Sequence, residues 1–240
     1  DTLALAGSEA GGTDAASALK NSVEYSKKAA QNGAIVSLSA HMPNFTNSKI
    51  KKNDDGSYDF FNCDFSESKD LSDDSLKTIL PGGENNEVYN AYLDIIADYA
   101  NQLANDNIPV MFRPFHENTG SWFWWGSMNT AETYKSLYRY TKDYMEQSGV
   151  HNLLWVYSPN GPVTSEAAYV SYYPGDEYVD ILAFDYYNDY NSYPAAADNS
   201  FFDSLDTTCN IVSSIAAKRG KIPAIAECGV RVMKKDGSDN

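Results

Sequence analysis

Two glutamates, Glu117 and Glu227, are the side chains whose type and position best suit acid–base chemistry in this chain. Each follows an apolar run that reads as a strand, and the functional residues of α/β folds gather at the carboxyl ends of strands. A glycosidase needs such a pair. One carboxyl protonates the leaving oxygen while the other attacks the anomeric carbon, about 5–5.5 Å away in retaining enzymes. The alternative, two solvated loop residues, stays open because the chain has 33 acidic residues.

An aromatic cluster directly follows Glu117. Trp122, Trp124 and Trp125 flank Phe123 within four residues. Indole rings offer flat apolar faces that suit the C–H faces of sugars, but aromatic side chains also dominate protein cores. We therefore expect one or two of these three tryptophans in the core and at least one in the cleft. Trp155, inside an apolar run, is expected in the core.

Four further polar residues lie near the expected strand ends. Arg113 stands in an apolar run and must be paired when buried, most simply with a carboxylate at the mouth of the fold. His41 and His116 are candidates for substrate contact, with hydrogen-bonded structural histidines as the equal alternative. Tyr187 could donate to the nucleophile or be a wall residue. His116 and Glu117 are expected to point to opposite sides if the chain is still extended there.

These residues require an alternating α/β scaffold. Helical patterns are predicted over residues 14–31, 86–106, 130–147 and 201–219. Short apolar runs predict strands over 3–7, 34–39, 108–115, 152–157, 179–184 and 222–226. Such runs indicate parallel strands covered on both faces by helices. Six strands would suit a doubly wound sheet, although no GxGxxG or P-loop motif supports a nucleotide-binding version of it. The other choice is a (β/α)8 TIM barrel missing pieces at both ends.

Composition removes several classes of function. The 240 residues carry a formal charge of −15, which disfavours nucleic acid and other polyanions as partners. No apolar run approaches the roughly 20 residues of a membrane span, so no membrane partner is expected. Three cysteines (Cys63, Cys209, Cys228) and three scattered histidines give little support to a metal site. We expect no metal and no cofactor.

The quoted residues carry a resemblance to a known family. The run Arg-Pro-Phe-His-Glu-Asn-Thr-Gly-Ser-Trp-Phe-Trp-Trp-Gly over 113–126 resembles the acid/base signature of family 26 glycoside hydrolases, the β-mannanases in particular. Ser-Ala-His-Met-Pro-Asn at 39–44, Asp-Tyr-Tyr at 185–187, Ala-Glu-Cys-Gly at 226–229 and Ile-Leu-Pro-Gly-Gly at 79–83 are similar to further family segments. The resemblance spans about residues 3 to 231.

The resemblance implies a (β/α)8 barrel that hydrolyses internal β-1,4-mannosidic bonds of mannan, galactomannan or glucomannan with retention. Glu117 would be the general acid/base and Glu227 the nucleophile. His116 would sit against the sugar at the cleavage subsite, and Tyr187 would hydrogen-bond Glu227. Trp122 would stack on the leaving side, with His41 on the other side.

One departure concerns the number of strands. With the six predicted strands numbered two to seven, the first and last barrel strands are missing. We therefore expect residues 1–240 to be a single catalytic barrel domain truncated at both ends. We further expect a secreted monomer that acts on a mannan-type polysaccharide and is attached to carbohydrate-binding modules in a longer chain. The alternatives are a mixed-linkage β-glucanase or β-1,3-xylanase of the same family, or a non-catalytic carbohydrate-binding fragment.

Overall fold

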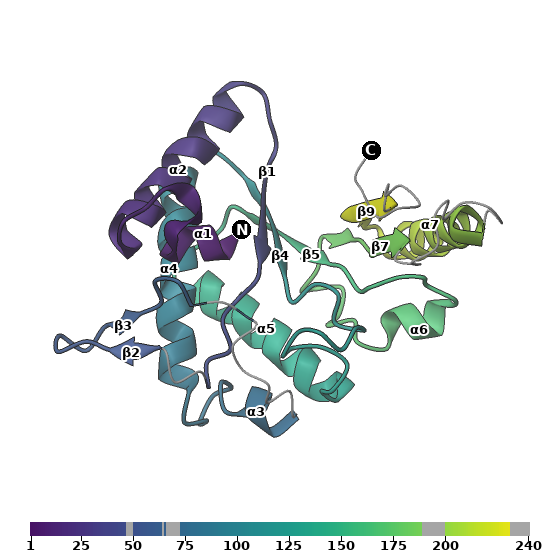
Figure 1. The fold of residues 1–240 in the computed structure, drawn as a ribbon. Helices are drawn as coiled ribbons and strands as arrows, with labels where there is room; N and C mark the ends of the chain where they lie inside the picture. The colour runs from purple at the N-terminus through teal and green to yellow at the C-terminus, as the bar shows by residue number, and fades with distance from the viewer. Residues whose placement is uncertain (47–49, 64, 66–72, 189–199, 231–240) are drawn as a thin grey trace, which may run out of the picture.

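Five parallel strands form the centre of the molecule. The computed structural model describes residues 1–46, 50–63, 65, 73–188 and 200–230 (Figure 1). The strands lie in the order β1-β4-β5-β6-β8. Their bounds are Val36–Ala40 (β1), Val110–Pro114 (β4), Leu153–Tyr157 (β5), Ile181–Leu182 (β6) and Ile222–Pro223 (β8). The parallel order with helices between strands confirms the predicted α/β class.

Two of these strands continue into a second pair. β7 (Asp185–Asn188) follows β6 closely along the chain, and β9 (Glu227–Val230) follows β8. The two pair in parallel, with Asp185 opposite Glu227 and Tyr187 opposite Gly229. Glu227 is therefore the first residue of a strand, and the residue opposite it in the neighbouring strand is Asp185.

Long helices connect the strands. They are α2 (Ala15–Gln31), α4 (Asn86–Ala104), α5 (Ala131–Gln147) and α7 (Ser200–Arg219), each within two residues of its predicted bounds. Asp14 caps α2 in a capping box with Ser17, and the Thr130 hydroxyl accepts from the third residue of α5, which satisfies amide groups left open at helix starts. In Figure 1, α2, α4 and α5 gather on one side of β1, β4 and β5, whereas α7 packs against β6 and β8.

The remaining elements are short. α3 (Asp73–Lys77) and α6 (Glu166–Val170) are helices of five residues. β2 (Lys51–Lys52) and β3 (Tyr58–Asp59) form a separate antiparallel pair. These pieces lie between β1 and α4 or between β5 and β6, so they decorate the parallel sheet without adding to it.

The predicted strand over residues 3–7 is wrong. The segment forms helix α1 (Thr2–Ala6), followed by a 3-10 turn η1 (Ser8–Ala10). An apolar run of five residues fits a buried helix as well as a buried strand, so periodicity cannot separate the two. Packing decides here, because α1 lies against α2, α4 and β1 and buries Leu5 and Ala6.

The sheet of the described residues is open, with β1 at one edge and β8 at the other. Ile222 and Ile225 at the β8 edge are 59% and 49% exposed, and Ile35 just before β1 is 77% exposed. Apolar side chains at unpaired strand edges favour association with further strands. At the centre of the sheet the apolar side chains are covered: Val110 and Phe112 of β4 are fully buried.

Candidate active site

The turn after β4 positions Glu117. Proline at position 114 supplies no N–H to continue the ladder, and Phe115 and Glu117 both adopt φ values of 53°. The backbone N–H of Glu117 donates to the carbonyl of Ser158 after β5, at 2.7 Å. The chain is therefore not extended at this point, so the condition for the expected alternation of His116 and Glu117 is not met. Non-glycine residues with positive φ are uncommon and collect at functional sites.

Glu117 is half-buried beside an indole. The Trp122 Nε1–H donates to Glu117 Oε2 at 2.7 Å. Burial raises the pKa of the Glu117 carboxyl above its ordinary value and the negative charge of Glu227 adds to this, while the Trp122 hydrogen bond opposes it. The carboxyl is thereby kept protonated to higher pH than a solvated glutamate, as a general acid requires.

Glu227 is held by two donors. The hydroxyl of Tyr187 donates to Glu227 Oε2 at 2.9 Å, and a guanidinium nitrogen of Arg113 contacts Glu227 Oε1. Tyr187 reaches the carboxylate from β7, which pairs with β9. The two contacts together fix the orientation of the carboxylate. The Glu227 side chain is 28% exposed, so it is open to a reactant.

Arg113 has the carboxylate partner that the sequence predicts, and a second one. Its Nη1 donates to Asp185 Oδ2 at 2.8 Å, while its Nη2 faces Glu227. The Ser158 hydroxyl donates to the other Asp185 oxygen at 2.9 Å. Burial raises the pKa of Asp185 to about 7, against the opposing effects of Arg113 and Ser158. Asp185 and Ser158 were not expected as site residues, although each directly follows an apolar run.

The two predicted histidines lie against each other. His116 Nε2 is 3.1 Å from His41 Nε2, and His41 Nδ1 contacts the carboxylate of Asp1. Burial lowers the pKa of His41, and it lowers the pKa of His116 to about 2, with Arg113 contributing in both cases. Both imidazoles are therefore neutral near pH 7. If His41 donates from Nδ1 to Asp1, His116 must donate from Nε2 to His41.

The aromatic cluster divides as expected. Trp122 is 51% exposed, whereas Trp124 and Trp125 are buried, as is Trp155. Trp125 stacks on Phe123 with ring centroids 4.4 Å apart, and its Nε1–H donates to the carbonyl of His116 at 2.8 Å. The buried rings thus support the turn that carries the site, and the exposed indole beside Glu117 is free to meet a ligand.

The structure therefore brings the predicted residues to one end of the parallel strands. The charge of Glu227 acts on Glu117, and Arg113 acts on both histidines. Tyr187 and Trp122 each hydrogen-bond one of the two glutamates. The arrangement combines a carboxyl group of raised pKa, a second carboxyl group held by Tyr187 and Arg113, and an exposed aromatic face in one site.

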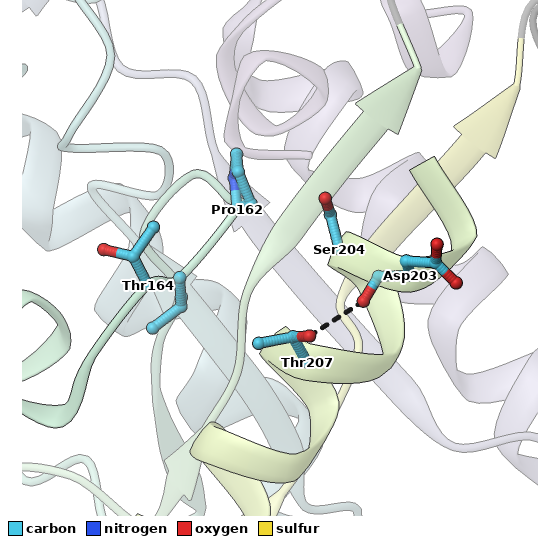
Figure 2. A pocket seen from close by; sticks show the side chains of 6 residues that line it. Pro162, Thr164, Asp203, Ser204 and Thr207 are labelled. Carbon is cyan, nitrogen blue, oxygen red and sulfur yellow. Dashed lines mark hydrogen bonds between the residues drawn. The ribbon is translucent and has the colours of Figure 1, made fainter. Parts of the chain in front are cut away.

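A separate hollow of about 300 Å³ lies between α7 and the chain after β5 (Figure 2). Its lining residues are Pro162, Val163, Thr164, Asp203, Ser204 and Thr207. The Thr207 hydroxyl donates to the Asp203 carbonyl at 2.8 Å, so it is occupied within its own helix. None of the predicted site residues lines this hollow.

Metal-ligating side chains do not cluster in the part of the chain that the structure describes: no group of three or more His, Cys, Asp or Glu could hold an ion there. Among the same residues, every helix is too short or too polar to cross a bilayer.

Comparison with known proteins relates this site to a family. The model of glycosyl hydrolase family 26 matches residues 9–236. A mannan endo-1,4-β-mannosidase of Bifidobacterium adolescentis is 37% identical over 98% of this chain and 23% of its own length. The catalytic domain of a Bacillus sp. JAMB-750 endo-β-1,4-mannanase superposes with a TM-score of 0.78 at 36% identity, covering 93% of this chain and 55% of that one.

A modular endo-β-1,4-mannanase of Cellulomonas fimi gives a TM-score of 0.77 at 32% identity, covering 95% of this chain and 47% of that one. The chain thus spans about a quarter of the length of the Bifidobacterium relative and about half of each structure. Its parallel strands and helices are those of a (β/α)8 barrel, although the described strands do not close. The family match over residues 9–236 and the superposition establish that the chain belongs to glycosyl hydrolase family 26.

Proposed function

We propose that this chain carries the catalytic centre of a retaining endo-β-1,4-mannanase. One observation supports this above the others: the charge of Glu227 acts on Glu117, and the two carboxyl groups have surroundings that suit two different roles. Burial raises the pKa of Glu117, as a proton donor requires, while the Tyr187 hydroxyl and Arg113 contact the two oxygens of Glu227 and orient it for attack. Two carboxyl groups in such different surroundings suit the separate roles of acid and nucleophile.

The reaction follows from these two roles. Glu227 attacks the anomeric carbon as the bond to the glycosidic oxygen breaks, and Glu117 gives its proton to that oxygen. The first product leaves with this proton, and the sugar remains as an ester of Glu227. Glu117, now charged, takes a proton from water, which attacks the same carbon and releases Glu227. Two inversions at one carbon give net retention.

The neighbouring side chains are assigned to substrate binding. The exposed face of Trp122 stacks on the sugar at the leaving side, next to the oxygen that Glu117 protonates. His41 is partly exposed and contacts the sugar on the other side as a neutral imidazole, while His116, 1% exposed, supports His41 through the 3.1 Å contact between their Nε2 atoms. Tyr187 orients Glu227 through its 2.9 Å hydrogen bond and borders the same space.

Mannan is the substrate class that the relatives favour. The Bifidobacterium protein is a mannan endo-1,4-β-mannosidase, and the two superposed structures are endo-β-1,4-mannanases. Mannan, galactomannan and glucomannan share the internal β-1,4-mannosidic bond, so all three are proposed substrates. Mixed-linkage β-glucan and β-1,3-xylan are the alternative outcomes of the test.

The test compares reducing-sugar release by the full-length protein on galactomannan, barley β-glucan and β-1,3-xylan. We expect release from galactomannan above all, with the β-anomer as the first product seen by proton NMR. Glu117→Ala and Glu227→Ala are the controls. Turnover that persists in both variants contradicts the assignment. Binding of mannooligosaccharides by the unmodified protein without turnover would identify a carbohydrate-binding fragment instead.

The setting of the domain is part of the proposal. The exposed isoleucines at the β8 edge support a barrel that further strands complete, so residues 1–240 would be one truncated catalytic domain. The modular Cellulomonas relative supports attached carbohydrate-binding modules. A polysaccharide cannot enter a cell, which supports action of a secreted monomer. Sedimentation of the full-length protein and its recovery from culture medium test these points.

A further inference from the structure

Ser158 hydrogen-bonds both to Glu117, in the turn after β4, and to Asp185 of β7. It directly follows β5 and is buried, with 1% exposure. Its carbonyl accepts the backbone N–H of Glu117 at 2.7 Å. Its hydroxyl donates to Asp185 Oδ1 at 2.9 Å. The first contact holds the turn that carries Glu117, the proposed general acid. The second contact is with Asp185, which shares Arg113 with Glu227, the proposed nucleophile.

The second contact reaches Glu227 in two steps. Asp185 is fully buried, and its two oxygens are divided between Ser158 and Arg113. The plane of this carboxylate is therefore set by one hydroxyl and one guanidinium. Arg113 then uses its other terminal nitrogen for Glu227. Because a guanidinium is planar and rigid, rotating the Asp185 carboxylate must move the nitrogen that faces Glu227.

The backbone around Ser158 leaves its hydroxyl as the adjustable part. The Asp185 N–H donates to the Pro159 carbonyl at 3.1 Å, and the Gly161 N–H donates to the Asp185 carbonyl at 2.7 Å. Asn160 and Asp185 also form a parallel bridge. These main-chain bonds hold residues 158–161 against β7 without any side chain. Removal of the Ser158 hydroxyl should therefore change the Asp185 carboxylate and leave the chain path in place.

We propose that Ser158 is a positioning residue that places both glutamates, acting on Glu117 through its carbonyl and on Glu227 through Asp185 and Arg113. The inference rests on the proposed function for its kinetic consequences, but the hydrogen-bond relay itself does not. No role in the two chemical steps is assigned to Ser158, since no reacting atom touches it.

The hydroxyl also sets the charge of Asp185. A donor to a carboxylate favours its ionised form, and Ser158 lowers the pKa of Asp185 against the effect of burial. The groups that face Asp185 are Arg113 from β4, Glu117 from the turn after it, Ser158 after β5, Tyr169 from α6, Tyr187 from β7 and Glu227 from β9. Loss of the hydroxyl removes one of the two side-chain donors to Asp185, so Asp185 should take up its proton at higher pH.

The first measurement is independent of activity. Carbon-13 NMR of the side-chain carboxyl groups follows the titration of Asp185 in the unmodified protein, in Ser158→Ala and in Ser158→Thr. We expect Ser158→Ala to raise the measured pKa of Asp185 by about 1, the size of one hydrogen bond to a charged group. Ser158→Thr keeps a hydroxyl and should restore the original titration. An unchanged Asp185 titration in Ser158→Ala overturns the proposal.

The second measurement is the pH profile of kcat/KM on galactomannan. Ser158→Ala should lower kcat about tenfold with little change in KM, and the acidic limb should move to higher pH with Asp185. A purely structural role would reduce the active fraction without moving the limb. Ser22→Ala is the matched control. Ser22 is also buried and hydrogen-bonded through its hydroxyl, but to carbonyls of Ala18 and Ala4 away from the site.

The two failures are distinguishable. If the unmodified protein releases no sugar from galactomannan, the proposed function fails, while the Asp185 titration still decides the role of Ser158. If Ser158→Ala does not fold, Ser158→Cys takes its place, because a thiol of similar size is only a weak donor and should give the same shift. A limb that stays in place in the folded variant, with kcat preserved, contradicts the inference.

Discussion

The indole nitrogen of Trp122 lies 2.7 Å from a carboxyl oxygen of Glu117, five residues earlier in the chain. Trp122 is 51% exposed, so the ring that donates to the proposed acid also presents a face to solvent. One side chain can therefore stack on a sugar and tune the proton donor beside it. The two effects work on different quantities, sugar affinity and the pKa of Glu117, and can be separated.

Trp122→Phe tests this separation. The phenyl ring keeps an aromatic face but removes the donor that lowers the pKa of Glu117. The pKa of Glu117 should rise further, because its charged form loses a hydrogen bond. We expect the basic limb of kcat/KM to move to higher pH, with a moderate rise in KM. A pH profile over the basic range measures both. A limb that stays in place contradicts the tuning role.

Gly120→Ala tests the placement of the same indole. A Cβ at position 120 would lie 2.4 Å from two ring atoms of Trp122, so the ring must shift. Misplacement near the reacting groups costs about 10² in rate, and we expect a loss of kcat/KM of that order with an unchanged thermal transition. Gly120→Ala combined with Trp122→Phe should cost less than the sum of the two changes, because the smaller ring relieves the clash.

The two glutamates should respond differently to the leaving group. Glu117→Ala removes the proton donor, which is worth about 10²–10⁴ in rate on a polysaccharide. The loss in kcat/KM should nearly vanish for an aryl mannoside whose phenolate leaves without a proton, whereas kcat stays low because hydrolysis of the ester still needs Glu117 as a base. Glu227→Ala removes the nucleophile and should abolish turnover of both substrates. Initial rates on the two substrates decide the assignment. The reverse pattern would exchange the roles of the two residues.

Arg113→Met should destabilise the fold strongly. The substitution leaves Asp185, which is fully buried, without its cationic partner. Removing one member of a buried ion pair costs about 3–5 kcal/mol. Arg113→Met with Asp185→Asn should recover part of this loss. Arg219→Met is the control, because its ion pair with Asp176 is solvent-exposed and should cost at most about 1 kcal/mol. Chemical denaturation measures all four proteins.

His116 should make stability depend on pH. Burial lowers the pKa of His116 to about 2, whereas an unfolded histidine titrates near 6.5. Below that value only the unfolded state binds the proton, so this contribution is present above pH 6.5 and decreases as the pH falls. The loss from pH 8 to pH 5 is about 2 kcal/mol. His116→Gln should show a smaller decrease in the free energy of unfolding over the same range. Equal slopes would contradict the buried neutral state.

Much of the site is predictable from the sequence because its residues follow apolar runs. Glu117 and Glu227 are found this way, and the need to pair a buried Arg113 correctly predicts a carboxylate partner. The identity of the partners is not predictable in the same way. Arg113 meets both Asp185 and Glu227 because the pairing of β7 with β9 sets these two residues opposite each other, which is a consequence of strand register.

The remaining differences have separate causes. The segment 3–7 is short and apolar, and its helical form depends on packing against α2 and against α4, which is distant in sequence. The turn at His116 is not predictable from the sequence, because Phe115 and Glu117 adopt left-handed backbone angles without glycine. The role of Ser158 is not predictable from its residue type, because a serine after a strand has many possible hydrogen-bond partners. Its significance comes from the two bonds that it makes.

The uneven exposure of the four tryptophans gives the site its own optical signal. Trp124, Trp125 and Trp155 are at most 4% exposed, so a quencher in solution reaches Trp122 almost alone. The net charge of −15 repels iodide, which makes neutral acrylamide the suitable quencher. Fluorescence that becomes shielded from acrylamide when an oligosaccharide is added would report occupancy of the leaving-group side directly, in variants that no longer turn over.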